Sequence, residues 1–516
     1  MSDLKNEQKP ERLNDILIFM SDQHTPYYSG FYGSRCADTP NLNRLGRQGV
    51  IFDECYTSSP LCGPARMSFL CGKRSARTGL FHKSTLPDTT PTFLHYLVER
   101  GYETVLVGRM HFVGADQYHG FTKHMAADMT PVTWNYKYAR EDMRKERGVY
   151  ASTDTFSGNG AASVAGGGTS PVLEYDRFVA DTALEYLSQP HDKPQCVCVS
   201  VYGPHFPYVA PKELYEKYRE RVSLPPAFDD SVDCDVLKHY PVEADEMVAL
   251  ACQAAYCGMI EHVDGVFGQV WEAFERFCDT RGTKRAVFYL SDHGDQCGDR
   301  HIFGKETFYE RSVKIPFIAA GDGIGRGIRV KDPVNIMDIG PTILEYVGAK
   351  PMDEADGISV ADALKGGSVP GHLVYSEFME RTDGKFIFGP YDPDASFSHG
   401  FMLRYGDYKY VTYEGYEHQD MLFNIKNDPE ERHNFAMSEP GTLKMMKELC
   451  RDEICHEEAV RNFRREDRIN DLMSKYEWAK GNADQSLRWK GASQAAGEYP
   501  EICVKNPAYK GRTIKG

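Results

Sequence analysis

Short apolar runs recur along the chain, and each is followed at once by side chains that can do chemistry. Continuous apolar runs of this length predict strands that are buried on both faces, as in parallel sheets. Ligands in such sheets gather at the carboxyl ends of the strands. The runs and the residues after them are Ile16 to Met20 before Asp22, Glu103 to Val107 before Arg109 and His111, Cys196 to Tyr202 before His205, and Arg285 to Leu290 before Asp292 and His293.

Helix-like segments alternate with these runs, at Pro40 to Gln48, Pro91 to Arg100 and Glu243 to Phe277. This alternation predicts an α/β fold, with a large and mostly parallel sheet sandwiched by helices. After about residue 370 the pattern changes to short, aromatic-rich strands separated by turns, so we expect a smaller C-terminal α+β domain with an antiparallel sheet. The strand candidates there are Val374 to Phe378, Phe401 to Arg404 and Tyr408 to Tyr413.

The same changes of pattern divide the chain into three predicted parts. Residues 1–370 form a catalytic α/β domain, with an insertion at about 126–171 where periodicity fades and glycine and serine accumulate. Residues 371–440 form the antiparallel-sheet domain, and residues 441–516 form a helical segment with an extended tail. We expect the insertion to be mobile. The tail should either fray or clasp another surface, and a neighbouring copy in a homo-oligomer is one such surface.

Composition and charge narrow the class of partner. The 516 residues are 41% hydrophobic, which suits a large core, and the net charge of −15 disfavours nucleic acid or an anionic membrane as a partner. Met1 to Asn14 lack the apolar core of a secretion signal, and no run approaches the about 18 apolar residues of a membrane span. The 14 cysteines are scattered, so we expect reduced thiols in a cytoplasmic protein.

A cysteine at a predicted helix start is the most reactive feature of the sequence. In the string Cys62-Gly63-Pro64-Ala65-Arg66, Pro64 suits the first turn of a helix, and Gly72 suits its end. Free backbone N–H groups at a helix start favour anions, so a thiol there could be activated or chemically converted. An arbitrary cysteine is more often a small buried apolar residue, and only the surrounding pattern can decide between the two.

Two of the strand ends carry residues that suit a metal ion. Asp22 with Gln23, and Asp292 with His293, would supply carboxylate, amide and imidazole ligands. Oxygen-rich ligation favours calcium, magnesium or manganese over a zinc site built from thiolates. Each aspartate alone could equally be a turn or helix cap.

The segment around Cys62 resembles the signature of the type I sulfatases, in the alkaline phosphatase superfamily. Cysteine, proline, arginine, leucine and glycine are all in register, and Cys71 stands where the family usually has threonine. Gln23 is similar to the Asp-Gln branch, which includes choline sulfatases and phosphonate monoester hydrolases. Further segments that resemble the family are Thr39 to Leu45, Gly108 to Gly114 with Asp116-Gln117 and His119 to Phe121, Ser291 to Asp295, Lys305 to Glu310, Val313 to Pro316, and Leu422 to Asn424 with Asn427 to Glu431 and Asn434.

The resemblance implies that Cys62 is oxidised to formylglycine and that one divalent cation is bound, calcium foremost, with magnesium or manganese as alternatives. It also implies that His205, with Lys305 as its competitor, protonates the leaving group, and that His111 acts as a base. Arg109 stands where the family usually has lysine, and His82 aligns with a common sulfate-binding asparagine. The implied metal shell is Asp22, Gln23, Cys62, Asp292 and His293; the implied catalytic residues are Cys62, Arg66, Arg109, His111, His205 and Lys305; and the substrate-binding candidates are His82, Arg109, Lys305 and, in the insertion, Trp134.

The activity implied by the resemblance is that of a sulfatase, a sulfuric ester hydrolase. It would release sulfate from a small organic ester such as a sulfated sugar, an aryl sulfate or choline sulfate. A phosphonate or phosphate ester hydrolase of the same superfamily is the alternative, and an unmodified binding protein of the same shape is a third hypothesis. The implied protein partner is a formylglycine-generating enzyme or a radical sulfatase-maturating enzyme.

Overall fold

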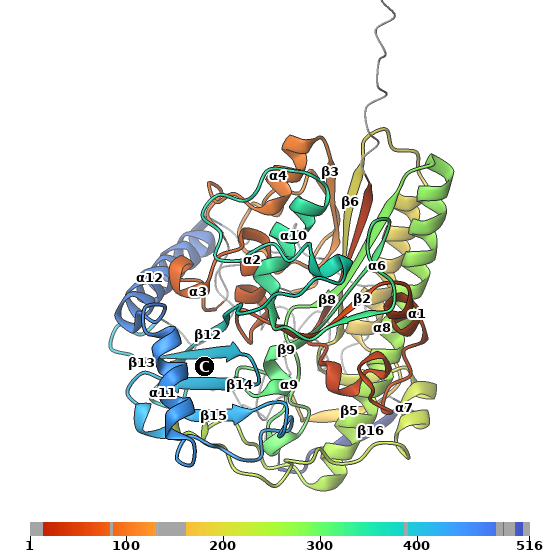
Figure 1. Ribbon diagram of the computed structural model, residues 1–516. Helices are drawn as coiled ribbons and strands as arrows, with labels where there is room; N and C mark the ends of the chain where they lie inside the picture. Colours follow the sequence, from red (N-terminus) through yellow and green to blue (C-terminus); the bar gives the residue numbers. More distant parts are fainter. Residues whose placement is uncertain are drawn as a thin grey trace, which may run out of the picture.

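A large, mostly parallel sheet forms the centre of the computed structural model (Figure 1). The structure describes residues 14–82, 86–130, 132, 161–385, 391–480, 489 and 501–508. In this part of the chain, every pairing in the large sheet is parallel except those of the strand Lys314–Gly321. The strand order is β10 (Ile328–Val330), β2 (Val50–Tyr56), β9 (Lys314–Gly321), β8 (Arg285–Ser291), β1 (Asp15–Asp22), β6 (Gln195–Pro204), β3 (Glu103–Gly108) and β4 (Lys123–Ala126), with β11 (Val334–Asn335) beside β2.

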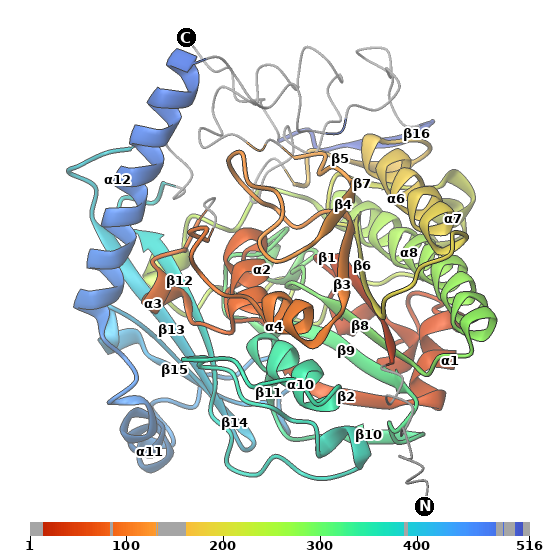
Figure 2. The ribbon, with the colours of Figure 1, turned by 90° about the horizontal axis from the view of Figure 1, so that it is seen from above.

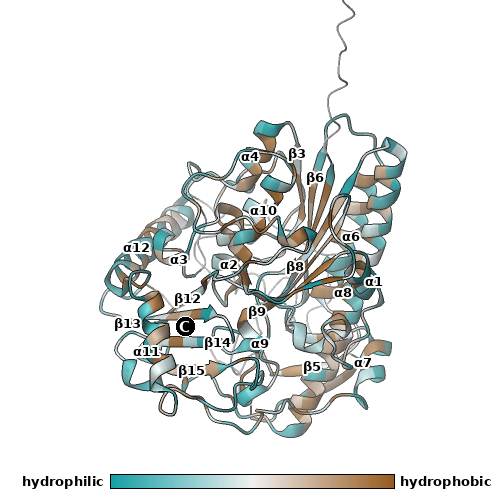
Figure 3. Ribbon diagram, in the orientation of Figure 1, coloured by the Kyte–Doolittle hydropathy of each residue, from teal (hydrophilic) through white to brown (hydrophobic). Residues whose placement is uncertain are grey.

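Helices cover both faces of this sheet, because its central strand β1 is apolar on both sides. Ile16 and Ile18 point into one core, and Leu17 and Phe19 point into the other. Figure 2 shows the two helical layers, and Figure 3 shows hydrophobic residues concentrated in the strands between them. The predicted α/β fold is confirmed. The first core contains α2 (Cys62–Cys71), α4 (Phe93–Arg100) and α10 (Ile339–Tyr346), and the second contains α1 (Pro40–Gln48), α6 (Pro171–Leu187) and α8 (Glu246–Arg281).

Helix α8 is longer than the predicted Glu243 to Phe277, and its ends have clear causes. Asp245 caps its start by accepting a hydrogen bond from the backbone N–H of Val248, and Gly282 ends it in the left-handed conformation, with φ 61°. Among the described helices, none is long and apolar enough to cross a bilayer.

A second, four-stranded antiparallel sheet lies beside the first (Figure 1), which confirms the predicted C-terminal antiparallel sheet. It is tied to the loop before α2, because Glu377 donates its backbone N–H to the carbonyl of Ser58. The domain boundaries near residues 370 and 440 remain predictions. The sheet consists of β12 (Val374–Arg381), β13 (Phe397–Tyr405), β14 (Tyr408–Tyr413) and β15 (Met421–Asn424), and α11 (Pro440–Cys450) and α12 (His456–Lys480) follow it.

A small third sheet joins the predicted insertion to the predicted tail. Strand β5 (Val164–Gly167), at the end of the insertion, pairs with β16 (Ile502–Lys505) on one side and with β7 (Tyr208–Ala210) on the other. A Cβ at Gly166 would lie 1.8 Å from the carbonyl oxygen of Ile502, so only glycine permits this close approach. The described tail residues therefore clasp their own chain. The homo-oligomer remains a prediction.

Candidate active site

Cys62 is the first residue of α2, as the sequence predicts. Gly72 ends the helix with φ 66°, and every side chain from Cys62 to Cys71 is buried. Cys62 itself is only 3% exposed. The helix start therefore holds the sulfur inside the protein, at the carboxyl ends of β1 and β8.

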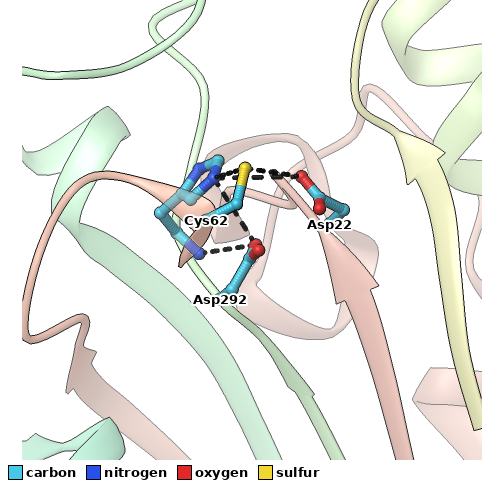
Figure 4. Close-up of side chains that lie close together, drawn as sticks. Asp22, Cys62 and Asp292 are labelled. Atoms are coloured by element: carbon cyan, nitrogen blue, oxygen red, sulfur yellow. Dashed lines mark hydrogen bonds and ion pairs between the residues drawn. The ribbon is translucent and has the colours of Figure 1, made fainter. Parts of the chain in front are cut away.

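Four side chains converge at this point. Asp22 ends β1, and Asp292 and His293 follow β8; since β1 and β8 are parallel neighbours, their carboxyl ends meet. Figure 4 shows the Cys62 thiol with the carboxylates of Asp22 and Asp292. The Cys62 Sγ lies 3.6 Å from Asp22 Oδ1 and 3.1 Å from His293 Nε2. One ligand atom from each of the four residues lies within 4.8 Å of the others.

The tautomer of His293 suits a metal ligand. Its Nδ1 lies 2.9 Å from the carbonyl oxygen of Gly294 and therefore carries the proton, which leaves a lone pair on Nε2. Burial lowers the pKa of His293, so its imidazole is neutral. The Nε2 atom, which faces Cys62, is therefore free to bind a cation.

Gln23 adds an amide oxygen to the same cluster. Its backbone has φ 67°, unusual for a residue with a side chain, and its N–H donates to Asp292 Oδ1 over 3.0 Å. Its Oε1 lies 2.7 Å from the ammonium of Lys305, which also donates to Cys62 Sγ over 3.1 Å. The predicted metal residues are thus brought together.

This donor set fits a divalent cation. Ligand atoms within 4.8 Å of one another suit an ion with bonds of about 2.0–2.6 Å. Carboxylate, amide and imidazole donors match calcium, magnesium or manganese. If Cys62 is converted to formylglycine, as the family resemblance implies, its Sγ marks the place of a hydroxyl oxygen. In this chain Asp22, Gln23, Asp292 and His293 would hold the ion.

Arg66 organises the two carboxylates. Its Nε lies 2.8 Å from Asp292 Oδ2 and one terminal nitrogen lies 2.9 Å from Asp22 Oδ2, while the other donates to the carbonyl of Arg109 and to Ser200 Oγ. Burial alone would raise the pKa of Asp22, but the charges of Arg109 and Arg66 hold it well below its usual range. Asp22 is therefore ionised and available to a cation.

The sulfur of Cys62 is not activated in this setting. Burial, and then the charge of Asp22, raise the pKa of the thiol to about 11. A neutral thiol is a poor nucleophile, so of the two fates predicted from the sequence, activation and chemical conversion, the electrostatics disfavour activation.

Arg109 and His111 follow β3 and form a pair. Arg109 Nε lies 2.7 Å from Asp22 Oδ2, and its guanidinium stacks 4.2 Å from the ring centroid of Tyr202. Its terminal nitrogen lies 2.8 Å from His111 Nδ1. Since a guanidinium only donates, Nδ1 must accept, and the hydrogen of a neutral His111 is on Nε2. In this arrangement His111 offers a donor rather than a base.

His205 follows β6, and its Nδ1 lies 2.6 Å from the carbonyl oxygen of Phe206. Burial, and then the charge of Lys305, lower the pKa of His205 well below its usual range. His205 is therefore neutral without substrate, with its lone pair on Nε2, whereas Lys305 already donates to the Cys62 position.

One predicted substrate-binding residue, His82, is not in this cluster. Both ring nitrogens of His82 face α12, since Nε2 lies 3.1 Å from Asp467 Oδ1 and Nδ1 lies 3.3 Å from Asn470 Nδ2. These contacts give no support to a sulfate-binding role for His82. Trp134 lies outside the described residues, with the middle of the predicted insertion.

Three buried side chains support the site but were not among the candidates chosen from the sequence. Asp128 accepts the backbone N–H of His111 over 3.0 Å, Ser200 accepts from Arg66, and Asp295 accepts from Gln23 over 2.6 Å. Asp295 belongs to the Ser291 to Asp295 motif, which was a usable signal. Asp128 and Ser200 carry no such local signal.

Comparison with known proteins assigns this chain to a family. The protein-family model described as "Sulfatase" matches residues 14–349. A second family model, described as "N-sulphoglucosamine sulphohydrolase, C-terminal", matches residues 298–457. The chain therefore belongs to the sulfatase family and is a hydrolase of sulfate esters.

One relative supports this assignment, and two solved structures share the fold. The choline-sulfatase of Rhizobium meliloti (strain 1021) is 30% identical over 456 residues, which cover 83% of each chain. A putative sulfatase structure from Bacteroides thetaiotaomicron has a TM-score of 0.64 at 23% identity and covers 95% of this chain and 99% of its own. The phosphonate monoester hydrolase of Agrobacterium radiobacter has a TM-score of 0.65 at 20% identity, with 86% and 95% covered. The predicted family resemblance is confirmed.

Proposed function

We propose that the protein releases sulfate from a small organic sulfate ester, using a formylglycine made from Cys62 and one divalent cation. The observation that carries this proposal is the position of Cys62, whose Sγ lies 3.1 Å from both His293 Nε2 and Lys305 Nζ and 3.6 Å from Asp22. A structural cysteine needs no such neighbours, whereas a nucleophile beside a cation does.

Formylglycine and the divalent cation would supply distinct chemistry. A hydrated formylglycine at residue 62 would supply two hydroxyls on one carbon, one to attack sulfur and one to expel sulfate. A divalent cation held by Asp22, Gln23, Asp292 and His293 would favour the deprotonated form of the attacking hydroxyl.

The chain's own residues bind the sulfate and move protons. Lys305 lies at the nucleophile, and with Arg109 it supplies positive charge where negative charge develops on the sulfate. His111 donates from Nε2 to a sulfate oxygen, and acts as the predicted base when Arg109 releases its Nδ1. Lys305 or His205 protonates the leaving oxygen; His205 gains its proton only when the negative charge of the substrate arrives.

Leaving-group chemistry separates Lys305 from His205. An ester whose leaving group is a weak base needs little protonation, so a variant that lacks the general acid should retain far more activity on an activated aryl sulfate than on an alkyl sulfate. We would compare Lys305→Ala and His205→Asn on both esters. The variant with the larger difference between the two identifies the acid.

The substrate class can be tested on the matured enzyme. The choline-sulfatase relative and the small organic ester predicted as substrate lead us to place choline sulfate, an aryl sulfate and sulfated monosaccharides in one panel. We expect sulfate release from at least one of them, abolished by Cys62→Ala and by a chelator. Failure on all of them, with formylglycine present, would contradict the proposal. A higher kcat/KM on a matched phosphonate ester would support the alternative hydrolase instead.

Maturation should precede folding. Cys62 is 3% exposed within a wholly buried helix, so a formylglycine-generating or radical sulfatase-maturating enzyme must act on an unfolded chain. Mass spectrometry of the peptide that contains Cys62 would detect formylglycine when the chain is co-expressed with either enzyme. Adding the same enzyme to the folded protein should leave Cys62 unchanged.

A further inference from the structure

The side-chain amide of Gln23 lies between two partners of opposite charge. Its Nε2 donates to Asp295 Oδ2 over 2.6 Å, and its Oε1 accepts from the ammonium of Lys305 over 2.7 Å. An amide has two ends of nearly equal shape, so its orientation depends on such partners. Here they turn the oxygen towards the metal cluster and the NH2 group away from it.

Asp295 is itself held so that it cannot turn. Its Oδ1 accepts the backbone N–H groups of Cys297 over 2.8 Å and Gly304 over 3.0 Å. The hydroxyl of Tyr208, from β7, lies 2.9 Å from both carboxylate oxygens. Asp295 has no exposed surface. Only Oδ2 therefore faces Gln23.

The backbone of Gln23 is fixed as firmly as its side chain. Its N–H donates to Asp292 Oδ1 over 3.0 Å, and its carbonyl accepts from the Tyr256 hydroxyl over 2.5 Å. These contacts maintain the φ of 67°. Rotation of the amide about its last bond is therefore the remaining way for Gln23 to present the wrong atom.

We infer that Asp295 is a positioning residue, which holds the amide oxygen of Gln23 as a ligand for the divalent cation. This inference rests on the proposed function, since it requires the cation. An amide NH2 in that place would direct two hydrogens at the ion and at Lys305, and the ion would lose one ligand. Partners of this kind commonly change metal affinity by about 10–100-fold.

Asp295→Asn is the decisive variant, because the geometry dictates its outcome. The two backbone N–H groups require an oxygen at the Oδ1 position, so the new NH2 group must take the place of Oδ2 and face Gln23. The amide of Gln23 must then flip to offer its oxygen to Asn, and it directs its own NH2 group at the cation. Shape and volume are almost unchanged, whereas metal affinity should fall.

A second variant restores the ligand. In the double variant Gln23→Glu/Asp295→Asn, one oxygen of Glu accepts from the new NH2 group and the other faces the cation, since a carboxylate has no wrong end. Its affinity should equal or exceed that of the original chain. Tyr208→Phe is the matched control, because it removes a hydrogen bond to Asp295 but leaves the pairing of Asp295 with Gln23.

The test is calorimetric titration of the chelator-treated, matured enzyme with Ca²⁺, Mg²⁺ and Mn²⁺, with circular dichroism to confirm folding. We expect affinity to fall about 10–100-fold in Asp295→Asn and to recover in the double variant, with a smaller change in Tyr208→Phe. Unchanged affinity in Asp295→Asn, or no recovery in the double variant, overturns the inference alone. If the original chain binds none of the three ions, the proposed metal site fails and the inference fails with it. If Asp295→Asn does not fold, the double variant alone decides: its metal affinity should equal or exceed that of the original chain, and a lower affinity overturns the inference.

Discussion

The guanidinium of Arg66 donates to the carboxylate of Asp292 over 2.8 Å, and neither side chain has any exposed surface. The same guanidinium pairs with Asp22, which Arg109 also contacts, so Arg66 is the buried cation that bridges the two carboxylates of the metal cluster. Its removal would take away the arginine partner of Asp292 and one of the two arginine partners of Asp22.

We therefore expect Arg66→Ala to lower the free energy of unfolding of the metal-free protein by about 3–5 kcal/mol. Arg66→Lys keeps the positive charge but loses the guanidinium that contacts both carboxylates. Its free energy of unfolding should therefore fall by less than that of Arg66→Ala. Urea unfolding with and without Ca²⁺ measures both. Because a cation would also offset the carboxylates, Ca²⁺ should return part of the stability lost in Arg66→Ala; an equal loss with and without it would contradict this account.

Asp128 should matter for turnover more than for substrate affinity. It accepts the backbone N–H of His111, whose φ is 66°, and its other oxygen accepts from Thr130. We expect Asp128→Ala to displace His111 and to lower kcat by about 10²-fold, with a smaller change in KM. Steady-state kinetics with Thr130→Val as the control, which spares the contact with His111, would check this. Equal effects of the two variants would rule out a specific role for Asp128.

Gly108 should tolerate no side chain because of a steric clash. Gly101 serves as the control, since it has the same backbone strain without the clash. Both have left-handed backbones, with φ 107° and 106°, but a Cβ at Gly108 would lie 2.1 Å from the carbonyl oxygen of Ser200, while a Cβ at Gly101 would meet nothing within 4 Å. Gly101→Ala should cost only the backbone strain, on the order of 1 kcal/mol. Gly108→Ala should cost clearly more and should also impair activity, because Arg109 follows directly. Thermal unfolding and a sulfate-release assay compare the two.

His399 should make the protein sensitive to acid. It is fully buried on β13, with Nδ1 3.1 Å from His456 Nδ1 and Nε2 3.9 Å from Glu377, and burial lowers its pKa to about 4. Arg74 and His456 oppose a positive charge there, and Glu377 favours one. Between about pH 6.5 and 4 the unfolded chain binds the proton and the folded chain does not, so stability falls as the pH falls.

The loss attributable to His399 should reach about 3 kcal/mol near pH 4. Urea unfolding from pH 7 to pH 4 should therefore show a shallower decline for His399→Gln than for the original chain. His433→Gln is the control, since the side chain of His433 is 73% exposed. Parallel curves for the original chain and His399→Gln would contradict the prediction.

The sequence predicted the central strands and the helix that begins at Cys62 because their signals are local. Continuous apolar runs identify buried strands, and Pro64 with Gly72 delimits the helix. The convergence of Asp22 and Asp292 also followed, because the carboxyl ends of parallel strands share an edge.

Contacts between residues that lie far apart in the sequence could not be predicted. His82 meets Asp467, 385 residues later, so its ring is engaged by α12. The tautomer of His111 depends on which atom of Arg109 reaches it, and the neutral state of His205 depends on burial. Neither spacing nor residue type contains that information. Even where the motif was visible, as for Asp295, its partner Gln23 lies 272 residues earlier.

The pairing of β5 with β16 also sets an order of events during folding. Val164 lies opposite Lys505, so most of the chain must be synthesised before this ladder can close, and closure of so long a loop is entropically costly. Strand β5 thus spends the time of synthesis with one edge unpaired, and an unpaired edge is the usual route to association between chains. Strand β16, the last of the described strands in chain order, is therefore the one that covers this edge of β5.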